Sequence, residues 1–221
     1  MINKVILLLS FFAIPFAALA SSSLVQQQQR FVEKIYENTS PDIREAGDRG
    51  IAEVRTSGIL NRAANVGDYA PEFDLPNAIG ERVSLYDELE TGPVVLVWYR
   101  GGWCPYCNLQ LQQIQASLAE IEAAGGKVIA ISPELPDQSM TTKEKHDLQF
   151  DVLSDVDNEV ADLYNLTYTV PDYVVDHYDL SSKLNEHNGN DNQRLPLAVT
   201  YVINRNGVIE YAFLDADYKN R

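Results

Sequence analysis

The sequence has 221 residues and is strongly acidic, with 32 Asp and Glu side chains against 17 Lys and Arg and a formal net charge of −15. An acidic surface repels nucleic acid and anionic membranes, so we expect no nucleic-acid partner. The length is sufficient for one well-packed domain.

The first 20 residues have the pattern of a secretory signal peptide. Lys4 precedes an apolar run over residues 5–19, and the run ends in small residues at Ala20, as at a cleavage site. The run is shorter than the roughly 20 residues that a spanning helix needs, and Pro15 interrupts it, which disfavours an uncleaved anchor. We therefore predict a signal peptide over residues 1–20 and an exported protein, which is periplasmic in a bacterium and otherwise secretory or extracellular.

Residues 21–65 are predicted to form a helical N-terminal extension. Apolar residues recur at helical spacing over residues 24–62, and Ser40-Pro41 divides this stretch into two parts. From Val66 onward, turn residues separate short apolar runs. We assign residues 66–221 to one domain, and no helix is predicted after its last strand.

Strands and helices alternate within residues 66–221. The apolar run from Val94 to Tyr99 predicts a strand buried on both faces, residues 109–124 have helical spacing, and residues 128–131 predict a second buried strand. This order predicts a parallel β-α-β unit. The remaining predicted elements are helices over 141–148 and 158–164, a short strand over 150–153, and a strand pair over 199–203 and 208–214 joined by an Asn-Gly hairpin.

Residues 168–194 are polar, acidic and aromatic, with no clear hydrophobic period. We interpret residues 172–191 as a solvated loop that could overhang the site described next.

The chain has two cysteines, Cys104 and Cys107, and both lie in one tetrapeptide. A disulfide between them would close a loop too small to constrain the unfolded chain much, so the pair indicates chemistry rather than stapling. Zinc needs about four ligands, and the three histidines are scattered. Copper held by both thiolates and a histidine stays open, although nothing in the spacing requires it. We predict no metal or other cofactor.

The motif from Tyr99 to Cys107 follows a predicted buried strand and opens a predicted helix. The first turn of a helix offers unpaired N–H groups and the positive end of the helix dipole, which favour a thiolate. Pro105 lacks an N–H and suits an early helical position. A thiolate is the nucleophile that attacks a disulfide or a peroxide. Trp103 and Tyr106 are predicted to pack around this site.

Residues 66–218 resemble the peroxiredoxin-like branch of the alkyl hydroperoxide reductase and thiol-specific antioxidant family, within the thioredoxin-like superfamily. The segments that carry the resemblance are 66–73, 99–107, 128–133, 153–155 and 200–207. The resemblance implies an α/β thioredoxin-like fold, with a central mixed β-sheet flanked by helices. It also implies a thiol-dependent antioxidant enzyme with a peroxide or disulfide substrate and a thiol reductant such as a thioredoxin-like protein. An oligomer is left open.

The sequence departs from this family at the site. Cys107 takes the position of the peroxidatic cysteine, and Cys104 replaces the threonine three residues before it. Arg100 stands where the family has a proline, and Ala198 falls where it has its active-site arginine. Arg100 or Arg194 could take the place of that arginine. These changes predict weak peroxide turnover relative to disulfide exchange.

Three hypotheses follow for the function. In the first, Cys107 attacks a peroxide and Cys104 resolves the product as an internal disulfide. In the second, Cys104 attacks protein disulfides, as in thioredoxins. In the third, the protein is a non-catalytic or metal-binding module on the same fold, motivated by Ala198.

Overall fold

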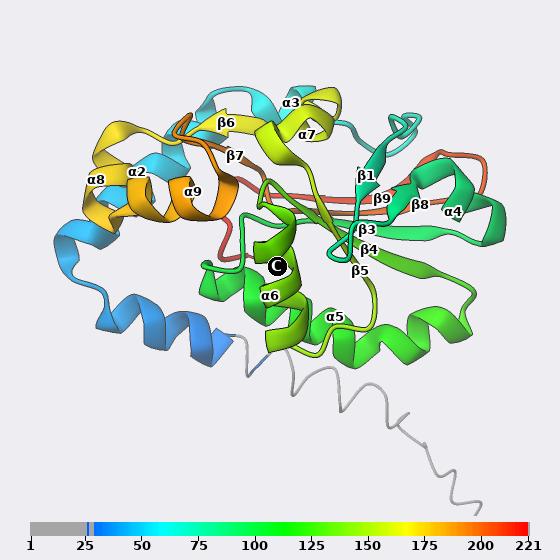
Figure 1. The fold of residues 1–221 in the computed structure, drawn as a ribbon. Coiled ribbons are helices and arrows are strands. Elements are labelled where there is room, and N and C mark those ends of the chain that lie inside the picture. The colour runs from blue at the N-terminus through cyan, green and yellow to red at the C-terminus, as the bar shows by residue number, and fades with distance from the viewer. Residues whose placement is uncertain (1–25, 27–28, 221) are drawn as a thin grey trace, which may run out of the picture.

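The computed structural model describes residue 26 and residues 29–220, so the predicted signal peptide lies outside the described residues. Its centre is a five-stranded sheet in the order β5-β4-β3-β8-β9. The strands are β3 (Val94–Trp98), β4 (Lys127–Ser132), β5 (Asp151–Ser154), β8 (Val199–Ile203) and β9 (Ile209–Leu214). The first three run parallel, and β8 and β9 are antiparallel to their neighbours. The predicted mixed sheet, its parallel pair and its hairpin are confirmed (Figure 1).

Helices cover both faces of the sheet because side chains along each strand alternate in direction. On β4, Val128 and Ala130 pack with α5 (Pro105–Ala123), whereas Ile129 and Ile131 face the opposite cluster. That second cluster includes residues of α3 (Ile59–Arg62), α4 (Leu85–Thr91) and α7 (Glu159–Leu163). In Figure 1, α5 runs below the sheet, and α3 and α7 lie above it.

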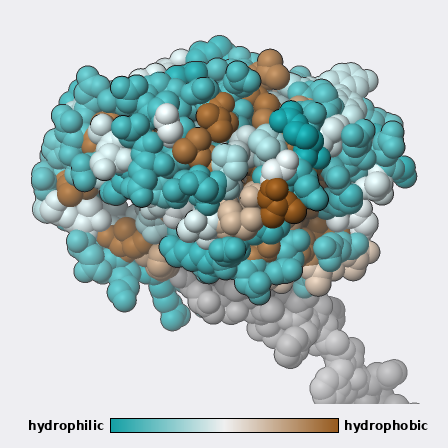
Figure 2. Space-filling view, in the orientation of Figure 1, coloured by the Kyte–Doolittle hydropathy of each residue, from teal (hydrophilic) through white to brown (hydrophobic). Residues whose placement is uncertain are grey.

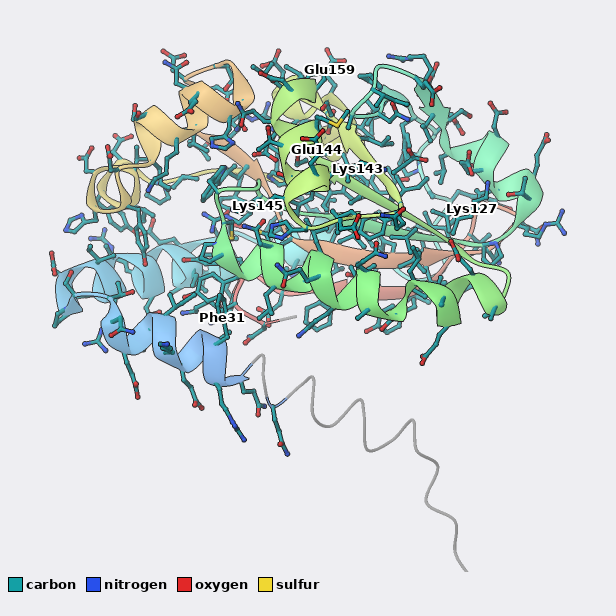
Figure 3. All side chains as sticks on the ribbon, turned by 60° about the horizontal axis from the view of Figure 1, so that its bottom comes forward. Phe31, Lys127, Lys143, Glu144, Lys145 and Glu159 are labelled. Atoms are coloured by element: carbon teal, nitrogen blue, oxygen red, sulfur yellow. The ribbon has the colours of Figure 1, made fainter. Side chains whose placement is uncertain are left out.

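The predicted helical N-terminal region is confirmed over its described residues. Residues 29–38 are helical, and α2 (Pro41–Thr56) begins at Pro41. The helical stretch is therefore interrupted at the predicted Ser40-Pro41 position. Figure 3 shows the first of these helices, which carries Phe31, beside α5. None of the described helices is long and apolar enough to cross a membrane.

The prediction of a solvated loop over residues 172–191 is wrong. The segment forms α8 (Asp172–Tyr178) and α9 (Leu180–Asn188). Their apolar side chains gather in a third buried cluster, whose members are Val170, Val174, Val175, Leu180, Leu184 and Leu195. Asp179 lies between the two helices in a left-handed conformation, with φ 49°. This break divides the segment into two short helices, so no helical repeat of apolar residues runs through it in the sequence. In Figure 1, α8 and α9 lie beside α2.

Two of the other predicted helices, α5 and α6 (Pro136–Lys145), start earlier than predicted. Helix α5 begins at Pro105 rather than at residue 109, and α6 begins five residues before the predicted Thr141. Each starts on a proline, whose missing N–H costs nothing in a first turn. The remaining elements are β1 (Asp74–Pro76), β2 (Arg82–Ser84), a short 3-10 helix (Val156–Asn158), β6 (Thr167–Thr169) and β7 (Arg194–Pro196).

Residues 215–220 follow β9 as turns and bends without a helix. The surface in the view of Figure 2 is mostly hydrophilic, with scattered apolar patches, as expected from the composition.

Candidate active site

The two cysteines lie where strand β3 passes into helix α5. Cys104 is the N-cap residue of α5, Pro105 is its first residue, and Cys107 lies in its first turn. Both cysteines are buried, with 1% of Cys104 and none of Cys107 exposed. The predicted strand-to-helix placement of the motif is therefore confirmed, and the helix N-terminus favours a thiolate at either sulfur.

The turn before Cys104 needs its two glycines. Gly101 has a φ of 144°, a conformation that residues with a side chain rarely adopt. A Cβ on Gly102 would lie 2.1 Å from Thr142 Oγ1 of α6. The Gly102 carbonyl accepts a hydrogen bond of 2.7 Å from Asn108 Nδ2 of α5. The turn is thus held between α5 and α6, and it fixes the position of Cys104 at the N-cap of α5.

Backbone groups of the turn hold the cysteines in place. The Arg100 N–H donates to Cys107 Sγ at 3.4 Å, and the Cys104 N–H donates to the Gly101 carbonyl at 3.0 Å. A donor aimed at sulfur stabilises the thiolate more than the thiol, because the charged form is the better acceptor.

Arg100 places a buried positive charge at the site. Only 6% of the residue is exposed, and its guanidinium lies 4.0 Å from the ring centroid of Tyr218 and 5.0 Å from that of Trp103. Burial by itself would lower the pKa of Arg100, yet the ionisable groups around it, both thiols among them, raise it above its ordinary value. Among the described residues, nothing accepts a hydrogen bond from its Nε. Arg100 is therefore a permanent cation within electrostatic reach of both sulfurs.

A pocket of about 160 Å³ opens onto Cys104. Arg100, Trp103, Pro105 and Tyr106 line it beside Cys104, whereas Cys107 does not. Its other walls come from the helix of residues 29–38, from α2, α8 and α9, and from the segment after β9; they include Tyr36, Arg44, Tyr178, Leu180, Lys183 and Tyr218. The prediction that the segment 172–191 could overhang the site is confirmed. Burial, with nearby negative groups, raises the pKa of Tyr106 to about 12, so this phenol keeps its proton at neutral pH.

Arg194 is not brought to the cysteines. It lies on β7, where its guanidinium contacts Asp162 Oδ1 at 2.5 Å and Thr167 Oγ1 at 2.8 Å. Ala198 is buried directly before β8. Val97 pairs with Thr200, and continuing this antiparallel register places Ala198 opposite Tyr99. The position that the resemblance aligns with the family's arginine therefore borders the site without a polar side chain.

Two site residues were not predicted from the sequence. Tyr218 follows β9 and packs against both Arg100 and Tyr106, with ring centroids 5.7 Å apart in the second pair. Glu134 lies just after β4 and accepts the Gly102 N–H at 2.9 Å. The sequence could have indicated Glu134, because it follows the predicted strand 128–131. The carboxyl ends of the parallel neighbours β3 and β4 meet at one edge of the sheet, which places Glu134 near the motif that follows β3. No sequence pattern indicated Tyr218.

In the part of the chain that the structure describes, no three His, Cys, Asp or Glu side chains form a group that could hold a metal ion.

Comparison with known proteins points to one family. The pattern of the AhpC/TSA family matches residues 66–212. A Mycobacterium tuberculosis relative (strain H37Rv) is 37% identical over 94 residues, which are 42% of this chain and 59% of that protein. Peroxiredoxin Bcp of Escherichia coli K12 is 33% identical over 100 residues, 45% of this chain and 64% of that protein. The chain thus spans less than two thirds of the length of these relatives.

Solved structures show the same fold at low identity. Peroxidoxin BcpB from Mycobacterium tuberculosis superposes with a TM-score of 0.56 at 19% identity, covering 71% of this chain and 91% of that one. A cysteine-to-serine mutant of PrxQ from Xylella fastidiosa superposes with a TM-score of 0.56 at 16% identity, covering 68% and 86%. The predicted thioredoxin-like fold of the peroxiredoxin type is confirmed.

Proposed function

Because the chain belongs to the AhpC/TSA family, we propose that it is a thiol-dependent antioxidant enzyme that reduces peroxides through a dithiol–disulfide cycle of Cys104 and Cys107. The observation that carries this proposal is the buried Arg100 cation within electrostatic reach of both sulfurs, at a helix N-terminus where Cys104 lines a pocket.

The geometry favours Cys104 as the sulfur that meets the peroxide, because Cys104 lines the pocket. Its thiolate attacks one peroxide oxygen, an S–O bond forms and the O–O bond breaks. The leaving oxygen takes a proton and departs as an alcohol, or as water from hydrogen peroxide. The sulfur is oxidised by two electrons to a sulfenic acid.

Cys107 then closes the cycle. Its sulfur attacks the sulfenic sulfur of Cys104, the S–S bond forms and water leaves. An external dithiol of the thioredoxin-like kind reduces this disulfide by exchange and is itself oxidised to a disulfide.

Arg100 has two roles in this scheme. Its charge favours the attacking thiolate, and its Nε–H is a buried donor for the negative charge that develops on the leaving oxygen. This donor stands in for the arginine that the family has at the position of Ala198.

The opposite assignment, with Cys107 attacking and Cys104 resolving, follows from the family resemblance and is the alternative to test. Exposure of Cys104→Ser and Cys107→Ser to hydrogen peroxide, followed by trapping of sulfenic acid with a dimedone reagent, separates the two. We expect labelling of Cys104 in Cys107→Ser and little labelling in Cys104→Ser. Labelling only of Cys107 would reverse the roles, and labelling of neither would refute peroxide reduction by these thiols.

Disulfide exchange is the second candidate function. Cys104 is an N-cap cysteine that borders a pocket, and this position suits attack on a protein disulfide. The rate of such exchange depends on the thiolate fraction and on access to the sulfur, and it needs no hydrogen-bond donor for a leaving oxygen. Parallel assays with hydrogen peroxide and a disulfide substrate test the sequence-based prediction that exchange is the faster reaction. Rapid peroxide turnover that is lost in Arg100→Gln would contradict that prediction and support the role of Arg100.

A further inference from the structure

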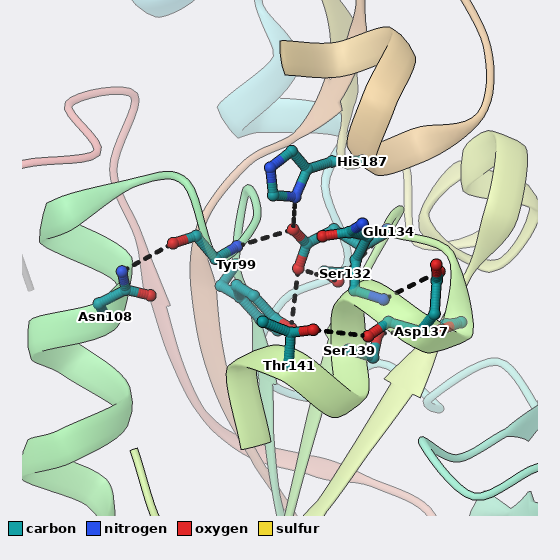
Figure 4. Close-up of polar contacts among 11 residues, drawn as sticks. Tyr99, Asn108, Ser132, Glu134, Asp137, Ser139, Thr141 and His187 are labelled. Atoms are coloured by element: carbon teal, nitrogen blue, oxygen red, sulfur yellow. Dashed lines mark hydrogen bonds and ion pairs between the residues drawn. The ribbon is translucent and has the colours of Figure 1, made fainter. Parts of the chain in front are cut away.

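Glu134 is a fully buried carboxylate that the proposed reaction does not use. None of the residue is exposed, and it lies between β4 and α6. Its Oε2 accepts from Tyr99 Oη at 3.3 Å and from Ser132 Oγ at 3.4 Å (Figure 4). Burying a carboxylate costs folding free energy unless hydrogen-bond donors and an opposite charge compensate it. A buried Glu134 therefore indicates a role other than filling space in the core.

Glu134 Oε1 joins two parts of the site. It accepts the Gly102 N–H at 2.9 Å and lies 2.7 Å from His187 Nδ1, near the end of α9. Since a carboxylate only accepts, His187 Nδ1 carries the hydrogen. One oxygen atom therefore ties the turn before Cys104 to α9, and Figure 4 shows Glu134 between His187 and Tyr99.

Helix α9 is part of the cover over the pocket. Leu180 and Lys183 line the pocket that opens onto Cys104, and Trp103 packs against the α8–α9 cluster. The end of α9 is also held by a backbone bond of 2.8 Å from Leu135 N–H to the His187 carbonyl. Loosening this end would therefore loosen both the pocket wall and the turn that precedes Cys104.

We propose that Glu134 is a positioning residue for Cys104, and that its ion pair with His187 is a pH-sensitive latch that holds the α8–α9 cover closed. The proposal rests on the proposed function only in taking Cys104 as the reactive sulfur. The latch is strongest when His187 is protonated and weakens when His187 loses its charge, because a neutral imidazole donates a hydrogen bond without an ionic attraction.

The acidic groups around His187 favour its protonated form. Its hydrogen bond to Glu134 raises the pKa of His187 above the ordinary 6.5, burial opposes this, and the charges of Glu134, Glu186 and Asp137 raise it further. These acids come from the β4–α6 connection, from α9 itself and from α6. A raised histidine pKa means that the latch contributes fully below pH 6.5 and is lost as the pH rises through the raised value.

The test is the rate of Cys104 alkylation by iodoacetamide in a full-length Cys107→Ser background, divided by the thiolate fraction from ultraviolet absorbance. With His187 intact, the normalised rate is expected to rise about tenfold as the pH passes through the His187 titration. His187→Gln and Glu134→Gln should react at the high rate at every pH. Glu186→Gln is the matched control, and it should keep the step with its midpoint at lower pH.

Hydrogen exchange of residues 172–188 gives an independent reading, and it should accelerate in His187→Gln below pH 6.5. The latch is refuted if His187→Gln keeps the parental pH step or leaves this exchange unchanged. If Glu134→Gln fails to fold, His187→Gln still permits the test, because the His187 side chain is partly exposed, at 20%. Alkylation needs no peroxide, so failure of peroxide turnover would count against the proposed function and leave the latch standing.

Discussion

Replacing Gly102 with alanine tests how tightly the turn before Cys104 is held. The new Cβ would lie 2.1 Å from Thr142 Oγ1 and 3.4 Å from Thr142 Cβ, whereas ordinary contacts begin at 3.4 Å. The overlap with the hydroxyl therefore exceeds one ångström. Gly102 does not shift easily, because its N–H and its carbonyl are hydrogen-bonded to Glu134 and Asn108. Thr142 is buried, at 4% exposure, and so has little room to move. Overpacking of this kind costs about 1–3 kcal/mol of folding free energy.

The assay is a double-mutant cycle with Thr142→Ala, which removes the clashing hydroxyl and leaves the ordinary contact at Cβ. Urea unfolding should show Gly102→Ala destabilised by about 2 kcal/mol in the parent chain and far less in the Thr142→Ala background. Alkylation of Cys104 should change in the single variant and recover in the double variant. Stability effects that add within about 0.5 kcal/mol would show that Thr142 does not confine the turn and would refute this reasoning.

Three further predictions concern charge, pH and processing. Arg100→Gln should slow peroxide-dependent oxidation about 10²–10³-fold and move thiol alkylation to higher pH, while Arg194→Gln should leave both unchanged in stopped-flow and alkylation assays. Burial raises the pKa of Asp155 from 3.8 to about 6, so the folded state holds its proton more tightly than the unfolded chain. Stability should fall by up to about 3 kcal/mol as the pH rises from 4 to 6, and a urea titration of Asp155→Asn should lack this contribution. The mature protein is expected to begin at Ser21; N-terminal sequencing that instead finds Met1 intact in the exported fraction would favour an anchor.

The outcomes of these experiments separate close alternatives. A loss of oxidation in Arg194→Gln that matches the loss in Arg100→Gln would contradict the assignment of Arg100 as the arginine of the site. An unchanged pH slope in Asp155→Asn would show that another group titrates in that window.

Local sequence patterns sufficed for much of the fold. The run from Val94 to Tyr99 is apolar throughout because β3 is buried on both faces, and a strand of this kind needs no distant information to be recognised. The same holds for the hairpin of β8 and β9, whose Asn-Gly turn sets the pairing. The cysteines were placed at a helix start because the motif is contiguous with the strand before it and the helix after it.

Contacts between distant segments decided the rest. Residues 172–191 are acidic and interrupted at Asp179, so their helices are stabilised mainly by burying apolar side chains against Leu195 and Trp103. Arg100 and Arg194 were equivalent candidates in the sequence. Tertiary packing buried Arg100 within electrostatic reach of both thiols and bound Arg194 to Asp162.

What the sequence by itself determined is therefore the placement of Cys104 and Cys107 in a strand-to-helix frame, since this placement depends on residues adjacent in the chain. Only the tertiary structure decided the surroundings. Glu134, His187 and Tyr218 reach the site from segments that are distant along the chain; Glu134, for example, is 32 residues from the Gly102 N–H that it accepts. Their roles come from burial and charge pairing, and these exist only once the separate elements pack together.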